Sequence, residues 1–224
     1  MAEKRLVIVF TKPAVSGSVK TRLIPTLTAD EAAEFHLAVT SDTIAVAESI
    51  AGHLMELHVA GADDDLTEFR ALYPGRAVQR QIGSDLGARL SAAFDASFGR
   101  GIEKTVVIGS DHPTLPPEYL VQAFDRLDSA DIVFGPSRDG GYYAVGLRRG
   151  AWPAAQGAFE GIPWSTPQVL DTSLNRAREI GLEIATLPEW YDVDRADDLP
   201  VVAGDARPGS ATMRFLMELW RRRT

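Results

Sequence analysis

The stretch 105–113, Thr-Val-Val-Ile-Gly-Ser-Asp-His-Pro, constrains the fold more than any other part of the chain. Its three consecutive apolar residues, Val106 to Ile108, are typical of a β-strand that is covered on both faces of a sheet. Gly109 and Pro113 then indicate where the chain leaves the sheet. Because ligands of open α/β sheets bind at the carboxyl ends of strands, Asp111 is expected at a binding site.

Short apolar runs alternate with helical patterns through residue 135, which predicts βαβ units. The predicted strands cover 6–10, 54–60, 77–81, 105–108, 131–135, 142–147 and 183–187, and the main predicted helices cover 28–50, 66–72, 88–98, 116–127, 165–180 and 210–223. A parallel pair needs a long crossover, so strand 142–147, which follows a short turn, is expected to be antiparallel to 131–135 or not adjacent to it. The prediction is an α/β fold, a three-layer α/β/α sandwich with a mostly parallel mixed sheet.

Length and composition limit the domain count and the function class. The 224 residues predict a single domain, 1–224, with the helix at about 210–223 appended. A formal net charge of −8 argues against a nucleic-acid binder, and the absence of cysteine excludes disulfides and thiolate metal sites. No signal peptide or membrane span is recognisable, so we expect a cytoplasmic protein; its oligomeric state stays open.

Several common motifs are absent. The loop after the first strand lacks a Gly-x-Gly-x-x-Gly fingerprint, and Val19 before Lys20 departs from a P-loop. Ser110 is followed by Asp111 and His112, which does not fit a nucleophile elbow, and the four histidines lack zinc-ligand spacing. These departures exclude the commonest dinucleotide, NTPase, hydrolase and zinc sites.

A cationic loop follows the first strand. Lys12, Lys20 and Arg22 could donate charge-assisted hydrogen bonds to a diphosphate, and the backbone around Gly17 could form an anion nest, with Thr21 between the two later cations. The alternative is a set of surface cations on a mobile loop.

Three aspartates are candidate metal ligands. A divalent ion that bridges phosphates typically takes one or two carboxylates, a role that suits Asp111, although an aspartate after a strand can also be a turn residue or a helix cap. In Asp192-Val193-Asp194 both carboxylates lie on the same side of an extended segment and could complete the site. Alternatively, Asp194 caps a helix that begins near Arg195 and is interrupted by Pro200.

Two further stretches are interpreted as pocket walls. Gly83 and Asp85 could face a nucleotide base or ribose, although Asp85 also suits a helix N-cap. The segment Asp139-Gly140-Gly141-Tyr142 could approach a second substrate, although a β-turn followed by core tyrosines is the alternative. Trp164 precedes a helix start and is a second possible substrate contact.

The ordered set of motifs resembles the selenodomain-associated transferase family over residues 5 to about 199. The resemblance rests on the segments Phe10-Thr-Lys-Pro, Gly17-Ser-Val-Lys-Thr-Arg-Leu23, Gly83-Ser-Asp-Leu-Gly87, Ile108-Gly-Ser-Asp-His-Pro113, Gly135-Pro-Ser-Arg-Asp-Gly-Gly-Tyr-Tyr143, Gly161-Ile-Pro-Trp-Ser-Thr166 and Asp192-Val-Asp194. It implies a GT-A fold of the nucleotide-diphospho-sugar transferase superfamily and a glycosyltransferase-like activity.

The resemblance also implies residue roles. Lys12, Lys20 and Arg22 would hold nucleotide phosphates, and Asp111 would coordinate Mg²⁺ or Mn²⁺ with Asp192 or Asp194 as the second carboxylate. One departure matters, because typical GT-A glycosyltransferases present Asp-x-Asp at the strand end, whereas this chain has Ser-Asp-His. A lone aspartate with a later Asp-Val-Asp is similar to nucleotidyltransferases that make guanylyl cofactors.

Three functions are therefore expected, in order of preference. The first is a metal-dependent transferase with a nucleotide-sugar donor and an unknown acceptor, in which Asp111 binds the ion, Lys20 and Arg22 stabilise the departing diphosphate and Asp139 activates the acceptor. The second is nucleotidyl transfer from an NTP with release of pyrophosphate. The third is a non-catalytic nucleotide-binding protein.

Overall fold

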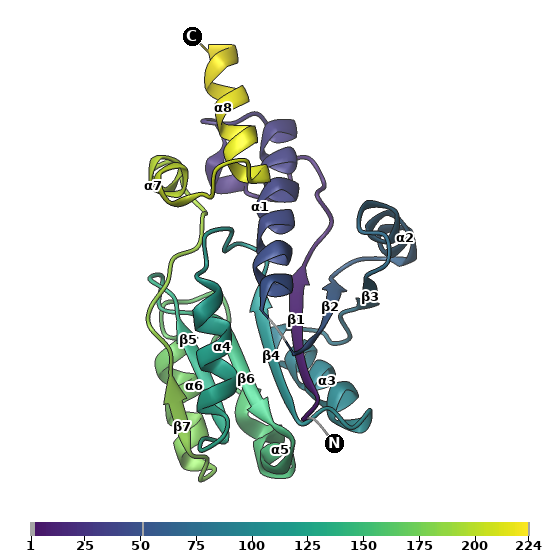
Figure 1. Cartoon of the computed structure of the whole chain (residues 1–224). Helices are drawn as coiled ribbons and strands as arrows, with labels where there is room; N and C mark the ends of the chain where they lie inside the picture. The colour runs from purple at the N-terminus through teal and green to yellow at the C-terminus, as the bar shows by residue number, and fades with distance from the viewer. Residues whose placement is uncertain (1–2, 51, 224) are drawn as a thin grey trace.

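A seven-stranded sheet forms the centre of the computed structural model, which describes residues 3–50 and 52–223 (Figure 1). The strand order is β3-β2-β1-β4-β6-β5-β7, and only β6 runs antiparallel to its neighbours β4 and β5. The strands are β1 (Arg5–Thr11), β2 (Leu54–Val59), β3 (Ala77–Arg80), β4 (Lys104–Gly109), β5 (Ile132–Pro136), β6 (Tyr142–Arg148) and β7 (Ile184–Thr186). The predicted mostly parallel mixed sheet is confirmed. Strand β6, which follows the short turn, is antiparallel to β5, the first of the two alternatives that the sequence left open.

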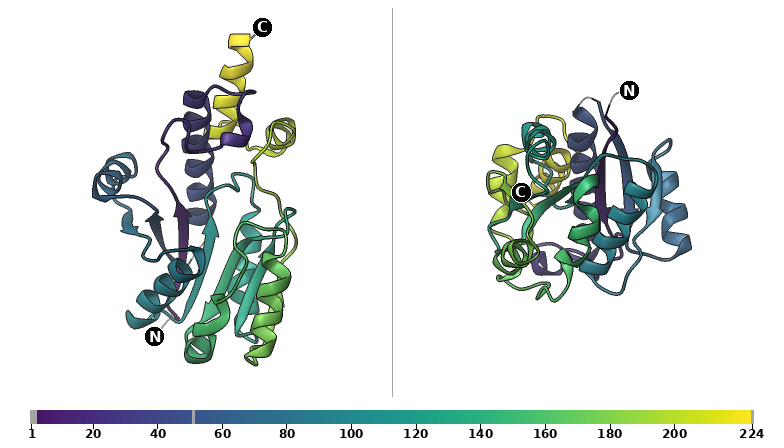
Figure 2. Two further views of the ribbon diagram at one scale, coloured as in Figure 1. Left: turned by 180° about the vertical axis from the view of Figure 1, so that it is seen from behind. Right: turned by 90° about the horizontal axis from the view of Figure 1, so that it is seen from below.

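Helices cover both faces of the sheet, which completes the predicted three-layer sandwich (Figure 2). One face carries α1 (Ala29–Ser49), α2 (Asp63–Leu72) and α4 (Pro117–Arg126), and the other carries α3 (Leu86–Gly99), α5 (Trp152–Ala155) and α6 (Val169–Glu179). Among the described residues, no helix has the length and apolar character needed to cross a membrane.

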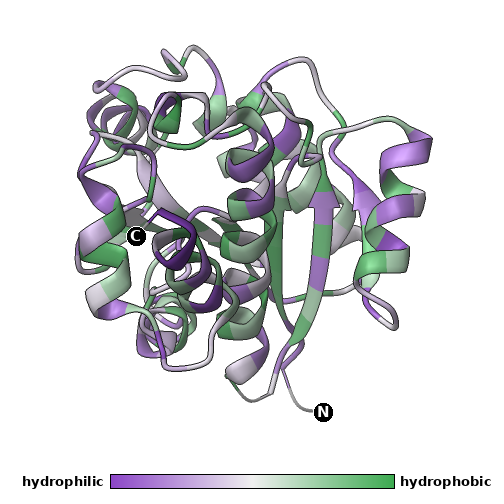
Figure 3. Ribbon diagram, turned by 90° about the horizontal axis from the view of Figure 1, so that it is seen from above, coloured by the Kyte–Doolittle hydropathy of each residue, from purple (hydrophilic) through white to green (hydrophobic). Residues whose placement is uncertain are grey.

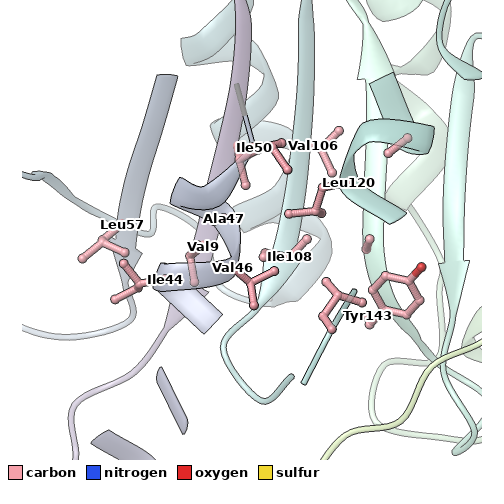
Figure 4. Packing of buried hydrophobic residues seen from close by; sticks show 14 of the residues in the cluster. Val9, Ile44, Val46, Ala47, Ile50, Leu57, Val106, Ile108, Leu120 and Tyr143 are labelled. Carbon is pink, nitrogen blue, oxygen red and sulfur yellow. The ribbon is translucent and has the colours of Figure 1, made fainter. Parts of the chain in front are cut away.

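The apolar face of α1 packs on the two central strands. Figure 4 shows Ile44 and Ala47 of α1 beside Val9 of β1, with Ile108 of β4 close by. All four side chains are fully buried or nearly so, so the ends of β1 and β4 are fixed to one helix. This packing matters for function because Asp111 follows β4 directly.

The N-terminal half of α1 extends past the strand ends and carries a separate cluster. Phe35 and Val39 pack there against α7 (Asp198–Asp205) and α8 (Ala211–Arg223), and the end of α8 at the C-terminus is strongly hydrophilic (Figure 3). Asp42 of α1 accepts hydrogen bonds from the backbone N–H groups of Ala211 and Thr212, at 2.9 and 2.7 Å. The carboxylate of Asp42 is buried, so it satisfies two otherwise unpaired amides at the start of α8.

Several predicted boundaries are wrong for local reasons. Helix α2 begins at Asp63 rather than at residue 66, because Asp65 accepts from the amide of Ala62 and aspartates are favourable in a first turn. Helix α6 begins at Val169 rather than at residue 165, since Ser165 has a φ of 65° that is not helical. Pro200 lies in the first turn of α7 and does not interrupt it. Residues 149–159, partly predicted as irregular, form the short helical turns η2 (Arg149–Ala151), α5 and η3 (Gln156–Phe159).

Candidate active site

Lys20 is the buried cation at the carboxyl edge of the sheet. It precedes η1 (Thr21–Leu23) in a left-handed conformation, with φ 48° and ψ 34°, and its side chain is only 3% exposed. Its Nζ lies 2.7 Å from Oδ1 of Asp111 and 3.2 Å from Oδ1 of Asp194, and it donates to the carbonyl of Val193 at 2.6 Å. The ammonium donates to Val193 and Asp194 and forms an ion pair with Asp111, so Lys20 joins β1, β4 and the loop at 190–194.

Asp111 presents two different oxygens. Oδ1 is buried against Lys20, whereas the side chain as a whole is 34% exposed, so its exposed part lies with the remaining atoms, among them Oδ2. Burial alone would raise the pKa of Asp111, but the charge of Lys20 and the contact with His36 outweigh it and hold the pKa well below its ordinary value. Burial also lowers the pKa of Lys20, but Asp111 and Asp194 reverse that effect and raise it. Both groups are therefore ionised at neutral pH.

The loop at 190–194 closes on the end of β4. The amide of Val193 donates to the carbonyl of Asp111 at 3.3 Å, and the ring Nδ1 of His112 donates to the carbonyl of Tyr191 at 3.1 Å. The structure thus brings together two segments that are eighty residues apart in the sequence, as expected for a shared site. His112 lies in the wall between them rather than facing an ion.

Asp194 does not cap the following helix, so that alternative is wrong. The amides of Asp194 and Arg195 donate instead to Oδ2 of Asp198, at 2.9 and 2.6 Å. The freed carboxylate of Asp194 pairs through Oδ1 with Lys20 and through Oδ2 with Arg22 at 3.4 Å. Both oxygens of Asp194 therefore already have cationic partners.

Asp192 lacks such a partner. Burial raises its pKa to about 6, and the nearby charges of Asp139 and Asp194 add to this effect. Asp139 itself shapes the turn before β6, where its Oδ1 accepts from the hydroxyl of Ser137 and from the amide of Gly141. The site thus places Asp111, Asp192 and Asp194 near one buried ammonium, with Asp139 near Asp192, and carries an excess of negative charge.

The donor set fits a hard divalent cation. Among the described residues, no group of three or more His, Asp or Glu side chains is arranged to hold a metal, so an ion here would need water and phosphate oxygens besides any carboxylate of the protein. Mg²⁺ commonly binds in this way and keeps several waters. Both oxygens of Asp194 are paired with cations, whereas Asp111 is paired through Oδ1 alone, so within the described part of the chain Oδ2 of Asp111 and the carboxylate of Asp192 are the candidates for an ion.

The rest of the cationic loop is open to solvent. Lys12, Gly17 and Thr21 are exposed, and the Arg22 side chain is 62% exposed. The backbone of Lys12 is held in place, because its carbonyl accepts a hydrogen bond from Nε2 of His36 at 3.1 Å. Lys20 is different from the other cations of the loop, since its ammonium is buried between two carboxylates and is not open to solvent, where a phosphate could bind.

The remaining predicted wall residues have structural roles. Asp85 caps α3 by accepting from the amide of Ala88 at 2.8 Å, and Gly83 lies against the backbone of Arg89, where a Cβ would come within 2.6 Å of the amide nitrogen. A Cβ on Gly140 would collide with the carbonyl of Pro167, so this close approach is to the protein itself. Tyr142 packs on Phe134 and on the core of the α3 side, as the structural alternative expected.

A pocket of about 750 Å³ lies between α3 and residues 152–164. Its walls combine the aromatic rings of Trp152, Phe159 and Trp164 with carboxylates, and none of the described lysines or arginines lines it. The lining residues are Asp85, Gly87, Ala88, Ser91, Ala92, Asp95, Trp152, Gln156, Phe159, Glu160, Gly161, Ile162 and Trp164. Trp164 meets Tyr142 edge-on, with ring centroids 6.3 Å apart, so the pocket adjoins the segment that begins with Asp139.

His36 was not expected at the site. It projects from α1, and its Nδ1 lies 3.8 Å from Oδ1 of Asp111. A single histidine inside a helical pattern carries no spacing signal, and only the three-dimensional fold places it behind a strand end.

Residues 43–166 match a family described as "Uncharacterized protein conserved in bacteria (DUF2064)". The chain belongs to the DUF2064 family. This DUF2064 protein is 30% identical over 186 residues to the 2-phospho-L-lactate guanylyltransferase of Methanopyrus kandleri, which covers 82% of this chain and 84% of the relative. It is 27% identical over 186 residues to the protein of the same name from Methanothermobacter thermautotrophicus, with 80% of this chain and 76% of the relative covered.

Solved structures extend the comparison. A protein of Desulfovibrio desulfuricans G20, provisionally called a nucleotide-diphospho-sugar transferase, has a TM-score of 0.88 and 31% identity over 97% of this chain and 95% of its own. A 4-diphosphocytidyl-2C-methyl-D-erythritol synthase, at 13% identity, has a TM-score of 0.59 over 90% of this chain and 97% of its own. The Rv0371c protein of Mycobacterium tuberculosis, solved with manganese, has a TM-score of 0.54 at 20% identity over 90% of this chain and 99% of its own.

The comparisons confirm the fold and indicate an enzyme of the transferase class for the DUF2064 protein. They favour nucleotidyl transfer, the second expected function, over the sugar-donor transfer that the resemblance put first. The narrower selenodomain-associated name stays a prediction.

Proposed function

We propose that this protein transfers a nucleoside monophosphate from an NTP to a phosphorylated acceptor and releases pyrophosphate. The observation that carries the proposal is the lone strand-end carboxylate of Asp111, which is joined to the distant Asp192-Val193-Asp194 loop through Lys20 at 2.7 and 3.2 Å. Glycosyltransferases of this fold were expected to show two aspartates at the strand end instead. The guanylyltransferase names of the relatives support the same reaction.

In this reaction a phosphate oxygen of the acceptor attacks the α-phosphorus of the NTP, and the bond between that phosphorus and the β-bridging oxygen breaks. Pyrophosphate leaves with the electron pair of the broken bond. A phosphate dianion needs no base, so Asp139 has no proton to remove here and keeps that role only if the acceptor is a hydroxyl.

The rate enhancement in this proposal therefore depends mostly on the positioning of the substrates and on charge stabilisation. Asp111 and Asp192 would hold a Mg²⁺ or Mn²⁺ ion, whose charge would neutralise the phosphates. Lys12 and Arg22 reach solvent from the loop and are suited to bind the triphosphate, with Arg22 able to bind bidentately. Lys20 keeps Asp111 and Asp194 in place, which orients the site around the ion.

The nucleotide and the acceptor occupy adjoining sites in this proposal, and Asp85 borders both. Gly83 and Asp85 would face the base or ribose, because Asp85 uses only Oδ1 as a helix cap. The pocket between α3 and residues 152–164 would take the organic part of the acceptor. Its carboxylates Asp85, Asp95 and Glu160 would repel a phosphate, so the phosphate end has to lie toward the metal site.

Glycosyl transfer is the second candidate, because the protein from D. desulfuricans covers 97% of this chain at a TM-score of 0.88 and carries a nucleotide-sugar name. In that case Asp139 would remove the acceptor proton.

A direct assay separates the two reactions. The protein would be incubated with Mg²⁺ or Mn²⁺, each NTP and a panel of phosphorylated acceptors, and pyrophosphate release would be measured; nucleotide-sugars would be tested in parallel for release of nucleoside diphosphate. Acceptor-dependent pyrophosphate that disappears in Asp111→Asn supports the proposal. Nucleoside diphosphate without pyrophosphate would favour glycosyl transfer. No product and no thermal stabilisation by any nucleotide would reject both, since a ligand at 100 times its Kd adds about 2.7 kcal/mol of stability.

A further inference from the structure

Helix α1 carries a buried polar stripe, which we define as His36, Thr40 and Thr43. Their spacing of four and three residues places them on one face of the helix, and none is more than 1% exposed. Burial of polar groups is unfavourable unless they find hydrogen-bond partners, so the partners of the stripe indicate its structural role.

Every member of the stripe contacts the end of a central strand. The hydroxyl of Thr43 lies 3.0 Å from the carbonyl of Ser110, directly before Asp111, and shares its proton with the carbonyl of Val39 in its own helix, also at 3.0 Å. The hydroxyl of Thr40 lies 3.5 Å from that of Thr11, the last residue of β1. The stripe therefore connects one helix to β1 just before the cationic loop and to β4 just before the candidate metal ligand.

His36 touches both sides of the candidate site. Its Nε2 lies 3.1 Å from the carbonyl of Lys12, and since a carbonyl only accepts, Nε2 must carry the proton and donate. Its Nδ1 lies 3.8 Å from Oδ1 of Asp111, within contact but beyond hydrogen-bond distance. One fully buried ring thus separates the backbone of the cationic loop from the carboxylate of Asp111.

We propose that the polar stripe of α1 is the positioning element of the active site, with His36 coupling the nucleotide loop to Asp111. The inference rests on the proposed function, because it assumes that Asp111 binds a metal and Lys12 a nucleotide. Partners behind a metal ligand fix its orientation, and their loss typically costs 10- to 100-fold in affinity or activity. His36, Thr40 and Thr43 are positioning residues, since none of them meets a ligand directly.

Two substitutions of His36 separate its two contacts. His36→Gln places an amide near Nε2 and can still donate to Lys12, but it leaves nothing in place of Nδ1 beside Asp111. His36→Asn places an amide near Nδ1 and loses the link to Lys12. We expect His36→Gln to weaken Mn²⁺ binding about tenfold with a smaller effect on NTP binding, and His36→Asn to show the opposite order.

A matched pair of threonines controls for stability. Thr43→Val removes the bond to Ser110 at the site, whereas Thr105→Val removes a bond of 2.8 Å to Ser97 at the opposite end of β4. Both threonines are fully buried, so both changes should lower the free energy of unfolding by similar amounts. Only Thr43→Val should also weaken Mn²⁺ binding.

The measurements are Mn²⁺ affinity by electron paramagnetic resonance of the free ion, NTP affinity by calorimetry, and the free energy of unfolding in urea. If the His36 variants do not fold, the threonine pair carries the test. Equal loss of stability in both threonine variants with Mn²⁺ and NTP affinities within twofold of the native protein would overturn the inference and leave the proposed function standing. A native protein that binds neither Mn²⁺ nor NTP would overturn the proposed function, and the inference with it.

Discussion

Lys20 and Asp111 form an ion pair with 2.7 Å between nitrogen and oxygen, although the lysine side chain is only 3% exposed. The same ammonium reaches Asp194, which is 174 residues further along the chain. A buried cation between two carboxylates is a junction of the fold as well as part of the candidate site. Its removal should therefore affect stability before it affects any ligand.

Lys20→Met should lower the free energy of unfolding by about 2–3 kcal/mol. Breaking a buried ion pair from one side typically costs 3–5 kcal/mol, and the one-third exposure of both aspartates reduces that loss. Arg22→Met is the control, because Arg22 contacts the same Asp194 from a mostly exposed position and should cost less than about 1 kcal/mol. Urea unfolding of both variants gives the comparison. Equal losses would show that Lys20 is not a structural junction.

Asp192→Asn should stabilise the metal-free protein at pH 8 and abolish its stabilisation by Mn²⁺. Burial and two neighbouring carboxylates raise the pKa of Asp192 to about 6, so its charged form is unfavourable in the folded state. The native protein should lose stability relative to the variant as the pH rises from about 4, near the ordinary pKa, to about 6. Thermal unfolding across this range, with and without Mn²⁺, checks both signs. Asp194→Asn is the matched variant and should keep Mn²⁺ stabilisation.

Glu56→Gln should destabilise the protein at neutral pH and much less in acid. Burial of Glu56 alone would raise its pKa, but hydrogen bonds from His58 and from both terminal nitrogens of Arg100 lower the pKa to about 2. The resulting stability is present above pH 4.5 and is lost as the pH falls toward 2. The expected loss at pH 7 is about 1–3 kcal/mol, measured by urea unfolding.

The control for this variant is Glu103→Gln. Glu103 pairs with Arg149 on the surface, where both side chains are about half exposed, so the variant should cost less than about 1 kcal/mol. A difference between Glu56→Gln and the native protein that stays constant from pH 7 to pH 2 would contradict the assignment.

Ala92→Trp should fill the pocket between α3 and residues 152–164. Ala92 lines that pocket, so the variant should raise the KM for the acceptor about tenfold, equivalent to about 1.4 kcal/mol, and leave NTP affinity unchanged. Ala96→Trp lies one turn further along α3, is exposed and does not line the pocket. Steady-state kinetics on both variants give the test. If they behave alike, the acceptor binds elsewhere.

The layers of the fold could be predicted from the sequence because they depend on local periodicity. Continuous apolar runs identified the buried strands, and the short turn before β6 left two alternatives, an antiparallel or a non-adjacent strand, of which the structure shows the first. Local side-chain chemistry moved the boundaries, as at α2, where Asp65 caps the helix earlier than the apolar pattern indicates.

The site could be predicted only in outline. Asp111 and the loop at 192–194 were recognisable because each follows a strand, yet the pairing of Lys20 with Asp111 and Asp194 depends on contacts distant in sequence. His36 could not have been singled out, since its partners are a backbone carbonyl and a carboxylate on other elements. Residue types identify candidate sites, but the packing of segments distant in the sequence determines which cation pairs with which anion.

The carboxylate of Asp42 makes the last helix part of the active-site scaffold. It lies on α1, between the stripe residues Thr40 and Thr43, and it binds the first two amides of α8. A chain shortened before residue 211 would leave a buried negative charge without partners on the same helix that holds both strand ends. Such a truncation is therefore expected to weaken ligand binding from outside the pocket. It would displace α1 and the strand ends that α1 holds, without removing a contact with the substrate.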